Sequence, residues 1–417
     1  MPDRKRHLAG DTPELGQAGQ YALGTNTFEL PLADRPALTG DSFANGIMPL
    51  HARSLGLRVW YPARTAMGSP AVYRHQLALP RHSAVALSSV GVAIPDAQPI
   101  DGASFPVVVL SHGFGGWNTQ FSRLAEHIAS RGYVVVSIDH RDKAPASMAE
   151  FLVSFGNVLI DRPLDQRAVI AQLPEMIAAS DGRLPACADA STTALVGYSM
   201  GGYGALQTAG ALPGFTSPPV DQLPAQARTM LGAAGPCPTI DALVLFAPWG
   251  GQPQNRAWNA ESLAQVRAPT LIVSGSEDDV VDHANGVRWL FENLSKSDRR
   301  LLTFREARHN IVGDPFELDD DVPFAAYEFL TEPVWRSDRL NAINQHFVSA
   351  FLDLHIKGRS ELAPYLDVPT EIASAGQWPI APGELLNGTR ASAAQPGYWR
   401  GFQRRWATGL ELARLKP

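Results

Sequence analysis

The chain has 417 residues, of which 45% are hydrophobic and 18% charged, with a formal net charge of −6 and a pI near 6.0. This size and composition suit one large core, in one domain with insertions or in two domains. The acidic balance offers no basic surface for nucleic acid, and no apolar run approaches the roughly 20 residues of a membrane-spanning helix. The charged N-terminus leads into no apolar segment, so the sequence as given predicts a cytoplasmic location, or export if a signal has been removed.

Apolar segments of strand length alternate with amphipathic segments along most of the chain. Strands are expected at residues 21–32, 55–61, 105–111, 133–139, 192–199, 242–247, 270–274 and 300–305. Helices are expected at residues 118–130, 165–179, 262–266, 284–294 and 335–356. Such alternation predicts the α/β class, with a mostly parallel central sheet covered by helices on both faces.

This pattern predicts one main domain over residues 21–358, with its N-terminal strands at the sheet edge. Residues 1–20 are polar and are expected to form a flexible N-terminus. Residues 359–417 are rich in proline and are expected to form a helical and loop appendage packed on the main domain. Residues 143–158 have an irregular pattern, which fits either a lid over a site or a plain surface loop.

A strand-to-helix turn carries the first chemical signal. The apolar residues 194–196 precede Gly-x-Ser-x-Gly at Gly197, Ser199 and Gly201, and helix-favouring residues follow. A turn this abrupt needs residues without bulk beside the serine, and it raises the serine hydroxyl above the sheet at a helix N-terminus. We therefore predict that Ser199 is a nucleophile, although the motif alone also fits an ordinary glycine-rich turn.

A serine nucleophile needs a base, and the base needs a carboxylate that orients it. Among the eleven histidines, His309 alone follows a late strand in a loop beyond an acidic turn. The acids of that turn are Glu277, Asp278, Asp279 and Asp282. We predict Asp278 as the orienting acid, because Gly-x-x-Asp ahead of two valines is typical of hydrolases, and we keep Asp279 as the alternative.

Two backbone N–H groups are expected to stabilise an oxyanion. One belongs to Met200, directly after the serine, and the other to Phe114, in the segment Ser-His-Gly-Phe-Gly-Gly-Trp that follows residues 105–111. The glycines of that segment let the backbone approach a substrate carbonyl. His112 is expected to brace this loop and not to act as a second base.

Two pairs of residues have open interpretations. Trp117 and Trp249 lie beside expected strand ends, where they either line an apolar substrate pocket or pack in the core. Cys187 and Cys237 precede neighbouring strands and either bridge or remain free thiols. No spacing typical of metal ligands occurs, so we predict no metal and no cofactor.

These segments resemble a known family. Residues 105–116 and 124–142 look like the platelet-activating-factor acetylhydrolase and predicted dienelactone hydrolase branch of the α/β-hydrolases, as do residues 57–62 and the group Asp161, Arg162 and Asp165. The resemblance covers roughly residues 21–358, which would then be the catalytic domain. It implies the α/β-hydrolase fold, with Ser199 as nucleophile, His309 as base, and Phe114 and Met200 as oxyanion donors.

Two departures limit what the resemblance implies. The animal acetylhydrolases carry their acid after the strand next to the serine strand, where this chain has Phe-Ala-Pro-Trp at residues 246–249, so phospholipid specificity does not transfer. Dienelactone hydrolases have cysteine in place of Ser199. The sequence therefore predicts a metal-free serine hydrolase that cleaves small or lipid-like carboxylic esters through an acyl-enzyme. The alternatives are an amidase or peptidase, a cofactor-free perhydrolase, and a non-catalytic binding protein on this fold.

Overall fold

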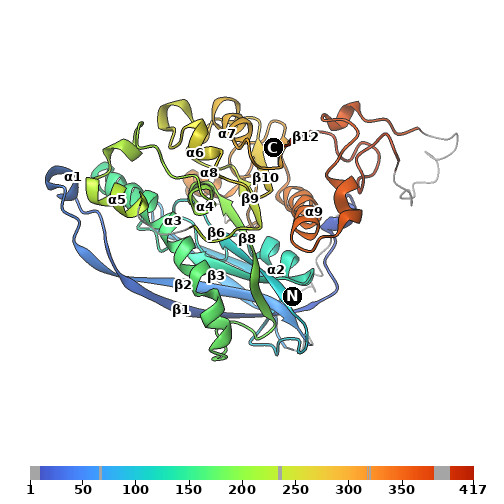
Figure 1. The fold of residues 1–417 in the computed structure, drawn as a ribbon. Coiled ribbons are helices and arrows are strands. Elements are labelled where there is room, and N and C mark those ends of the chain that lie inside the picture. The colour runs from blue at the N-terminus through green and yellow to red at the C-terminus, as the bar shows by residue number, and fades with distance from the viewer. Residues whose placement is uncertain (1–9, 65–67, 233–236, 317, 319–320, 380–394) are drawn as a thin grey trace.

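The structure is a computed structural model that describes residues 10–64, 68–232, 237–316, 318, 321–379 and 395–417 (Figure 1). Its main sheet has ten strands in the order β12-β11-β10-β9-β8-β6-β7-β2-β1-β5, and β3 and β4 form a separate hairpin. The strands are β1 (Ala22–Pro36), β2 (Leu50–Ala63), β3 (Val72–Leu77), β4 (Val85–Val90), β5 (Ile94–Pro95), β6 (Phe105–Ser111), β7 (Val134–Asp139), β8 (Ala188–Tyr198), β9 (Ala242–Phe246), β10 (Thr270–Gly275), β11 (Arg299–Phe304) and β12 (Leu410–Leu415).

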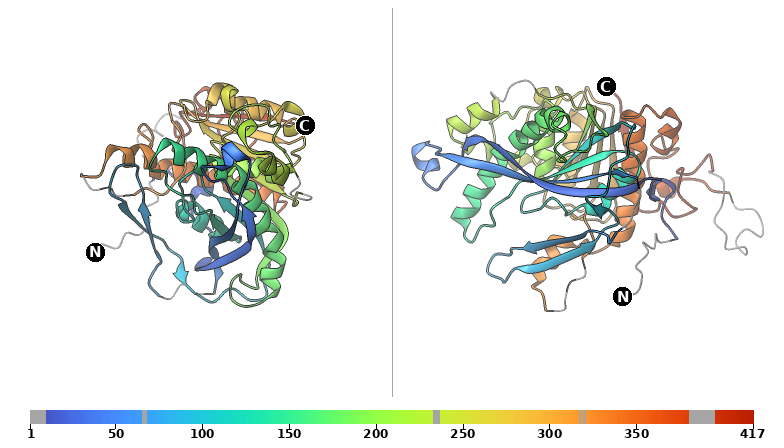
Figure 2. Two further views of the ribbon diagram at one scale, coloured as in Figure 1. Left: turned by 90° about the vertical axis from the view of Figure 1, so that its left-hand side faces the viewer. Right: turned by 90° about the horizontal axis from the view of Figure 1, so that it is seen from below.

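Helices cover both faces of this sheet (Figures 1 and 2). The α-helices are α1 (Ser42–Asn45), α2 (Ser122–Ser130), α3 (Met148–Ala178), α4 (Met200–Thr208), α5 (Ala225–Gly232), α6 (Ala260–Leu263), α7 (Arg288–Asn293), α8 (Phe324–Leu330) and α9 (Ser337–His355). Shorter helical turns are η1 (Glu14–Gly16), η2 (Val220–Gln222), η3 (Pro253–Asn255), η4 (His283–Val287), η5 (Ser360–Tyr365) and η6 (Ala373–Ala375). Helix α2 packs with α9, whereas α3 packs with α4 and α5.

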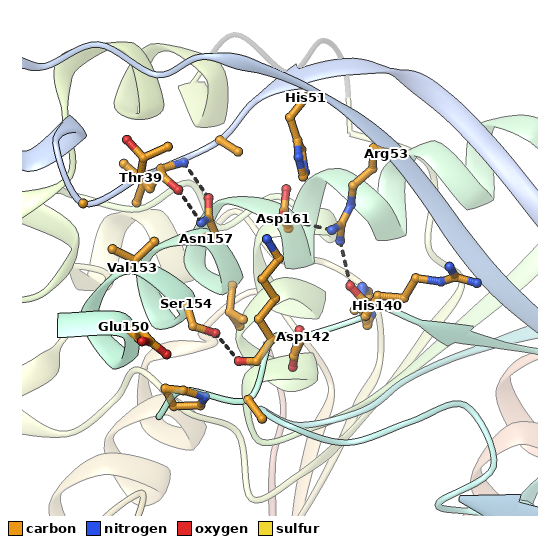
Figure 3. A pocket seen from close by; sticks show the side chains of 18 of the residues that line it. Thr39, His51, Arg53, His140, Asp142, Glu150, Val153, Ser154, Asn157 and Asp161 are labelled. Carbon is orange, nitrogen blue, oxygen red and sulfur yellow. Dashed lines mark hydrogen bonds and ion pairs between the residues drawn. The ribbon is translucent and has the colours of Figure 1, made fainter. Parts of the chain in front are cut away.

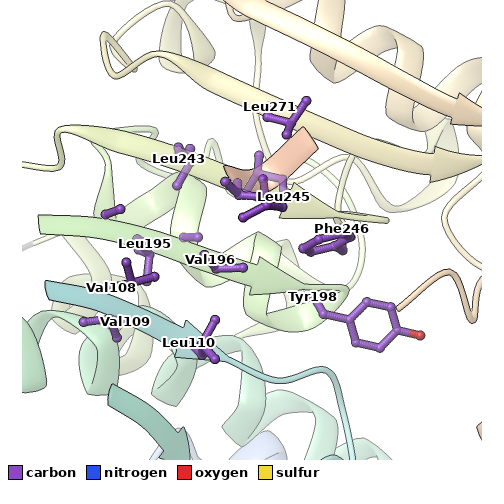
Figure 4. Packing of buried hydrophobic residues seen from close by; sticks show 14 of the residues in the cluster. Val108, Val109, Leu110, Leu195, Val196, Tyr198, Leu243, Leu245, Phe246 and Leu271 are labelled. Atoms are coloured by element: carbon purple, nitrogen blue, oxygen red, sulfur yellow. The ribbon is translucent and has the colours of Figure 1, made fainter. Parts of the chain in front are cut away.

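The centre of the sheet is parallel, as predicted. Strands β7, β6, β8, β9, β10 and β11 run in one direction, while β1, β2 and β12 add antiparallel pairings at the two edges. Figure 4 shows why: the central strands carry aliphatic side chains on both faces, such as Val108 and Val109, or Leu195 and Val196. A strand that is apolar on both faces is stable only between two layers of helices. Parallel strands also bring their carboxyl ends, and the loops that follow them, to one rim.

The structure differs from the sequence analysis in four segments, two inside the chain and two at its ends. Residues 148–158 are the first turns of α3 and not an irregular segment, because Ser147 caps the helix: its Oγ accepts the Glu150 N–H at 3.2 Å. Residues 62–104, for which the sequence analysis expects no strand, contain β3, β4 and β5. The β3–β4 hairpin covers a small second hydrophobic cluster, called the satellite cluster, which contains Leu77, Val85, Leu87, Trp117 and Ala326. The hydrophobic pattern of these short strands is too weak to predict them from the sequence.

The chain ends are also more integrated than expected. Residues 1–9 lie outside the described residues, but residues 10–20 are held rather than flexible: Leu15 is buried, and its N–H donates to His346 Nδ1 of α9 at 3.1 Å. The C-terminal segment is not merely an appendage, since β12 pairs antiparallel with β11 and closes the sheet edge. In the described part of the chain, no helix is both long and apolar enough to cross a membrane.

Candidate active site

Ser199 lies at the turn from β8 into α4, in a backbone conformation that few side chains adopt. Its φ is +52° and its ψ is −113°. The turn brings backbones so close that a Cβ at Gly197 would lie 2.4 Å from the Gly201 carbonyl oxygen, and one at Gly201 would lie 2.1 Å from the Ser111 carbonyl oxygen. Both glycines are therefore required by close approach, and the strained turn holds the Ser199 hydroxyl within hydrogen-bonding distance of His309.

His309 joins Ser199 to a carboxylate. His309 Nε2 lies 3.1 Å from Ser199 Oγ, and His309 Nδ1 lies 2.8 Å from Asp278 Oδ2. The other oxygen of Asp278 accepts the N–H groups of Val280 and Val281 at 3.0 and 3.1 Å. With its carboxylate held in this way, Asp278 favours the tautomer with a proton on Nδ1, which leaves Nε2 free to accept the serine proton.

Two loops must approach closely for this arrangement. A Cβ at Gly275 would lie 2.2 Å from the Ala307 carbonyl oxygen, which in turn accepts the Glu277 N–H at 2.9 Å. The turn after β10 thus lies directly on the loop after β11. The sequence predicted the convergence of Asp278 and His309 from the parallel order of these strands, and the structure brings the two side chains together.

The alternative acid points elsewhere. Asp279 is exposed and pairs with Arg308 at 2.6 Å, and the hydrogen bond from Arg308 lowers the pKa of Asp279. Asp282 instead accepts the Asn285 N–H at 2.9 Å and caps η4. Asp278 is therefore the acid of this turn that reaches His309, as the sequence analysis favoured.

The two expected oxyanion donors lie beside Ser199. Gly113 approaches so closely that a Cβ there would lie 3.2 Å from Ser199 Cβ, so the loop that carries Phe114 lies directly beside Ser199. Met200 is the first residue of α4. Among the described residues, neither the Phe114 N–H nor the Met200 N–H has a hydrogen-bond partner. An unpaired N–H at the N-terminus of α4 and a second one in the loop after β6 suit an incoming negative oxygen.

Four aromatic rings, called the aromatic wall below, pack together beside the oxyanion loop. Phe114 contacts both Phe151 and Phe155 edge to face, with each pair of centroids 5.7 Å apart. Phe155 contacts Trp249 at 5.4 Å, and Trp249 packs in turn on Tyr203 of α4. The first turns of α3 thus place Phe151 and Phe155 beside the oxyanion loop, and Trp249 borders the same wall.

Trp117, by contrast, packs away from the site. Its ring stacks on His75 of β3, with centroids 3.9 Å apart and planes 5° apart, and it also contacts Phe316. It is 4% exposed and belongs to the satellite cluster under the β3–β4 hairpin. Of the two tryptophans proposed for a substrate pocket, only Trp249 lies where it can serve; the position of Trp117 depended on a hairpin that the sequence did not reveal.

A cavity of about 530 Å³ lies on another side of α3 (Figure 3). Its wall includes Arg53 and Val153, but none of Ser199, His309 or Asp278. Val153 and Asn157 face this cavity, whereas Phe151 and Phe155 face the oxyanion loop. The cavity is therefore separate from the triad.

Neither cysteine is bridged: Cys187 is a buried free thiol and Cys237 a partly buried one. Burial raises the pKa of Cys187 to about 11, so its thiol stays protonated at neutral pH. Cys237 lies near Arg167 and Gln207 at the far end of α4. The interpretation of these residues as free thiols is thus correct.

Comparison with known proteins agrees with this fold. Residues 51–156 match the family model "Platelet-activating factor acetylhydrolase, isoform II", and residues 254–316 match "Serine aminopeptidase, S33". A solved ferulic acid esterase from Streptomyces cinnamoneus is similar over 84% of this chain and 94% of its own, with a TM-score of 0.56 and 21% identity.

The curated relatives match a smaller share of this chain than the solved esterase does. Cutinase est1 from Thermobifida alba is 24% identical over 51% of this chain and 55% of its own length. Cutinase 2 from Thermobifida cellulosilytica is 26% identical over 48% and 58%, and a bis(hydroxyethyl) terephthalate hydrolase from Streptomyces coelicolor is 24% identical over 49% and 51%. The chain thus spans about half the length of the curated relatives that it matches.

Proposed function

On the α/β-hydrolase fold that the sheet and the comparisons show for this chain, we propose that the protein is a serine hydrolase of carboxylic esters. One observation carries this proposal: His309 lies within hydrogen-bonding distance of both Ser199 Oγ, at 3.1 Å, and Asp278 Oδ2, at 2.8 Å. Binding alone would not require a strained serine, an imidazole and an oriented carboxylate in line.

The reaction follows from this geometry. Ser199 Oγ attacks the ester carbonyl while His309 Nε2 takes its proton, and the carbonyl oxygen becomes an oxyanion held by the N–H groups of Phe114 and Met200. The C–O bond to the alcohol breaks as His309 returns the proton to it, leaving an acyl-enzyme. Water, deprotonated by His309, attacks the acyl carbon and releases the acid and Ser199. Asp278 accepts the hydrogen bond of His309 Nδ1 and stabilises the imidazolium.

The aromatic wall suggests the acyl group. Phe114, Phe151, Phe155 and Trp249 provide flat apolar surface beside the oxyanion position. Flat rings stack favourably on such surfaces. Two similar proteins are named for terephthalate and ferulic acid, both aromatic acids. We therefore propose esters of aromatic acids as preferred substrates.

A fluorophosphonate probe tests the function directly. The probe should form a stable adduct on Ser199 that mass spectrometry of a digest locates, and Ser199→Ala should abolish it. p-Nitrophenyl esters from acetate to palmitate, together with p-nitrophenyl benzoate, then report acyl preference. Folded protein that neither labels nor turns over any ester would instead favour the non-catalytic binding protein.

A second candidate is amide hydrolysis, since the serine aminopeptidase model matches residues 254–316, which carry Asp278 and His309. An amine leaves less readily than an alcohol, so the His309 proton transfer would be more demanding. Benzoate and benzamide of the same leaving-group frame separate the two: we expect ester turnover to exceed amide turnover by at least about 10³-fold.

A further inference from the structure

The oxyanion loop is tied to the protein interior through one carbonyl. The carbonyl oxygen of Gly113 accepts hydrogen bonds from Arg162 Nη2 at 2.8 Å and from His112 Nδ1 at 2.7 Å, besides a longer one from the Gly116 N–H at 3.3 Å. This carbonyl and the Phe114 N–H belong to the same peptide unit. In a trans peptide the C=O and N–H bonds point in opposite directions. Anchoring the oxygen toward the interior therefore aims the N–H away from it, on the side where Gly113 meets Ser199.

The tautomer of His112 follows from its other nitrogen. His112 Nε2 lies 3.1 Å from the backbone N of His140, which can only donate. The neutral ring must then carry its proton on Nδ1, where it donates to the Gly113 carbonyl. Burial, followed by the charge of Arg162, lowers the pKa of His112 to about 4, so this neutral tautomer persists at neutral pH.

Arg162 holds more than the Gly113 carbonyl. Its Nε donates to the His112 carbonyl at 3.2 Å, and its Nη1 donates to Asp142 at 2.9 Å. Asp142 Oδ2 in turn accepts the Gly115 N–H at 2.8 Å. The loop is thus fixed on both sides of Phe114, by the carbonyls before it and by the N–H after it.

Both members of this ion pair are buried. The Arg162 side chain is 0% exposed and that of Asp142 3%. Burial by itself would raise the pKa of Asp142, but the charge and hydrogen bonds of Arg162 outweigh it and hold that pKa well below its usual range. A buried ion pair is seldom a gain in stability compared with apolar residues, so a positional role explains its presence better.

We propose that Arg162, paired with Asp142, is a positioning residue that locks the Gly113–Phe114 peptide with its N–H aimed at the oxyanion. This inference rests on the proposed function. Without the lock, the peptide can rotate, present its carbonyl oxygen to the site and lose one of two oxyanion donors. Such a loss acts on the transition state and leaves ground-state binding of the ester largely intact.

Arg162→Lys is the first test, because an ammonium cannot reach Asp142 and both loop carbonyls at once. We expect kcat per active site, titrated with the fluorophosphonate, to fall on the order of 10- to 100-fold with KM changed less than about threefold. Affinity for phenylboronic acid, whose serine adduct places an oxygen in the oxyanion position, should fall by a similar factor. Arg167→Lys is the matched control: Arg167 is a buried arginine of the same helix and donates to the Gln207 carbonyl, away from the loop.

A second variant guards against misfolding of the first. The pair Arg162→Gln with Asp142→Asn removes both buried charges together, and we expect the same loss of kcat and of boronate affinity. The inference is overturned if both variants keep kcat and boronate affinity within twofold of wild type per active site. It is also overturned if Arg167→Lys loses as much as they do, since the effect would then be general packing. Wild-type protein that fails to label would instead refute the proposed function itself.

Discussion

The described part of the chain contains two clusters in which a histidine links a serine to an aspartate, and we propose chemistry for only one of them. The proposed site, called the active cluster below, is Ser199, His309 and Asp278. The buried cluster is Ser111, His140 and Asp165. In the buried cluster, His140 Nδ1 lies 2.9 Å from Asp165 and His140 Nε2 lies 2.8 Å from Ser111 Oγ, so the distances match those of the active cluster. Three side chains at triad distances are thus not sufficient for a site.

The two clusters differ first in how far their histidine side chains are exposed to solvent. The side chains of His140 and Asp165 are both 0% exposed, whereas that of His309 is 15% exposed. Arg35 and Arg53 both pair with Asp165, so this carboxylate balances two charges that the N-terminal strands bring in. The buried cluster therefore anchors β1 and β2 to α3.

The two clusters also differ in the backbone conformation at their serines. Ser111 ends a regular strand, and its hydroxyl also accepts from Gln166 Nε2 at 2.8 Å. Ser199 has a positive φ, begins a helix and lies beside unpaired N–H groups. A reacting serine needs this strained turn and the neighbouring N–H donors, and these come from the backbone and not from the triad side chains.

The largest expected effect contrasts the two serines. Ser199→Ala should lower kcat by about 10⁵- to 10⁶-fold, because among the described residues no other hydroxyl hydrogen-bonds to the imidazole ring of His309. Ser111→Ala should leave kcat within about threefold, since it removes only buried hydrogen bonds and lowers the melting temperature instead. Esterase assays with thermal unfolding of both variants make this comparison, and equal losses of activity would contradict it.

The second effect contrasts two neighbouring carboxylates. Asp278→Asn should lower kcat by about 10³- to 10⁴-fold, because an amide cannot stabilise the imidazolium of His309. Asp279→Asn removes only an exposed pair with Arg308 and should remain within twofold of wild type. Steady-state kinetics on one ester decide, and a damaging Asp279→Asn would move the acid to that residue.

The third effect concerns pH and the buried histidines. Burial, followed by the charge of Arg131, lowers the pKa of His346 to about 3, and burial lowers that of His140 well below its usual value. The unfolded chain then binds more protons than the native state below pH 6.5, so the free energy of unfolding should fall as the pH drops from 7 toward 4. A single such histidine contributes about 2–3 kcal/mol over that range.

Urea unfolding at several pH values measures this slope. His346→Gln, in α9 and away from both clusters, should flatten the slope while kcat at pH 7.5 stays unchanged. A slope that is unaffected by this change would mean that other buried groups dominate the acid sensitivity.

The smallest effect tests the aromatic wall. Phe155→Ala should lower kcat/KM for p-nitrophenyl benzoate by about 5- to 10-fold, because one flat contact with the acyl ring is lost. The acetate ester, which is too short to reach the wall, should change less than twofold. Equal losses for both esters would place the acyl group elsewhere.

Much of the active cluster was readable from local sequence because each member follows a signal of its own. The glycines around Ser199 predict a sharp turn after a strand, and Gly275 predicts a turn that carries Asp278. His309 follows a segment that reads as a buried strand. The order of parallel strands then requires these loops to meet at one rim. The parallel core was predictable for the same reason, since fully apolar strands allow few other arrangements.

Other features depended on contacts between distant segments. The helix through residues 148–178 carries Gly156 and Pro163, which weaken its local signal, and its packing on α4 and α5 overrides them. Trp117 packs in the cluster under the β3–β4 hairpin. Strand β12, near the C-terminus, pairs with β11 at the edge of the main sheet. Local pattern cannot show these, because their energy comes from partners far away in sequence.

The sequence by itself determined which side chains could react and that they would gather at one rim of a parallel sheet, because strand period and turn glycines are local properties. Only the tertiary structure decided which cluster of serine, histidine and aspartate remains accessible, and how Arg162 and Asp142 hold the loop beside Ser199. Burial and the direction of a peptide N–H are set by the whole packed molecule, and no short stretch of residues encodes them.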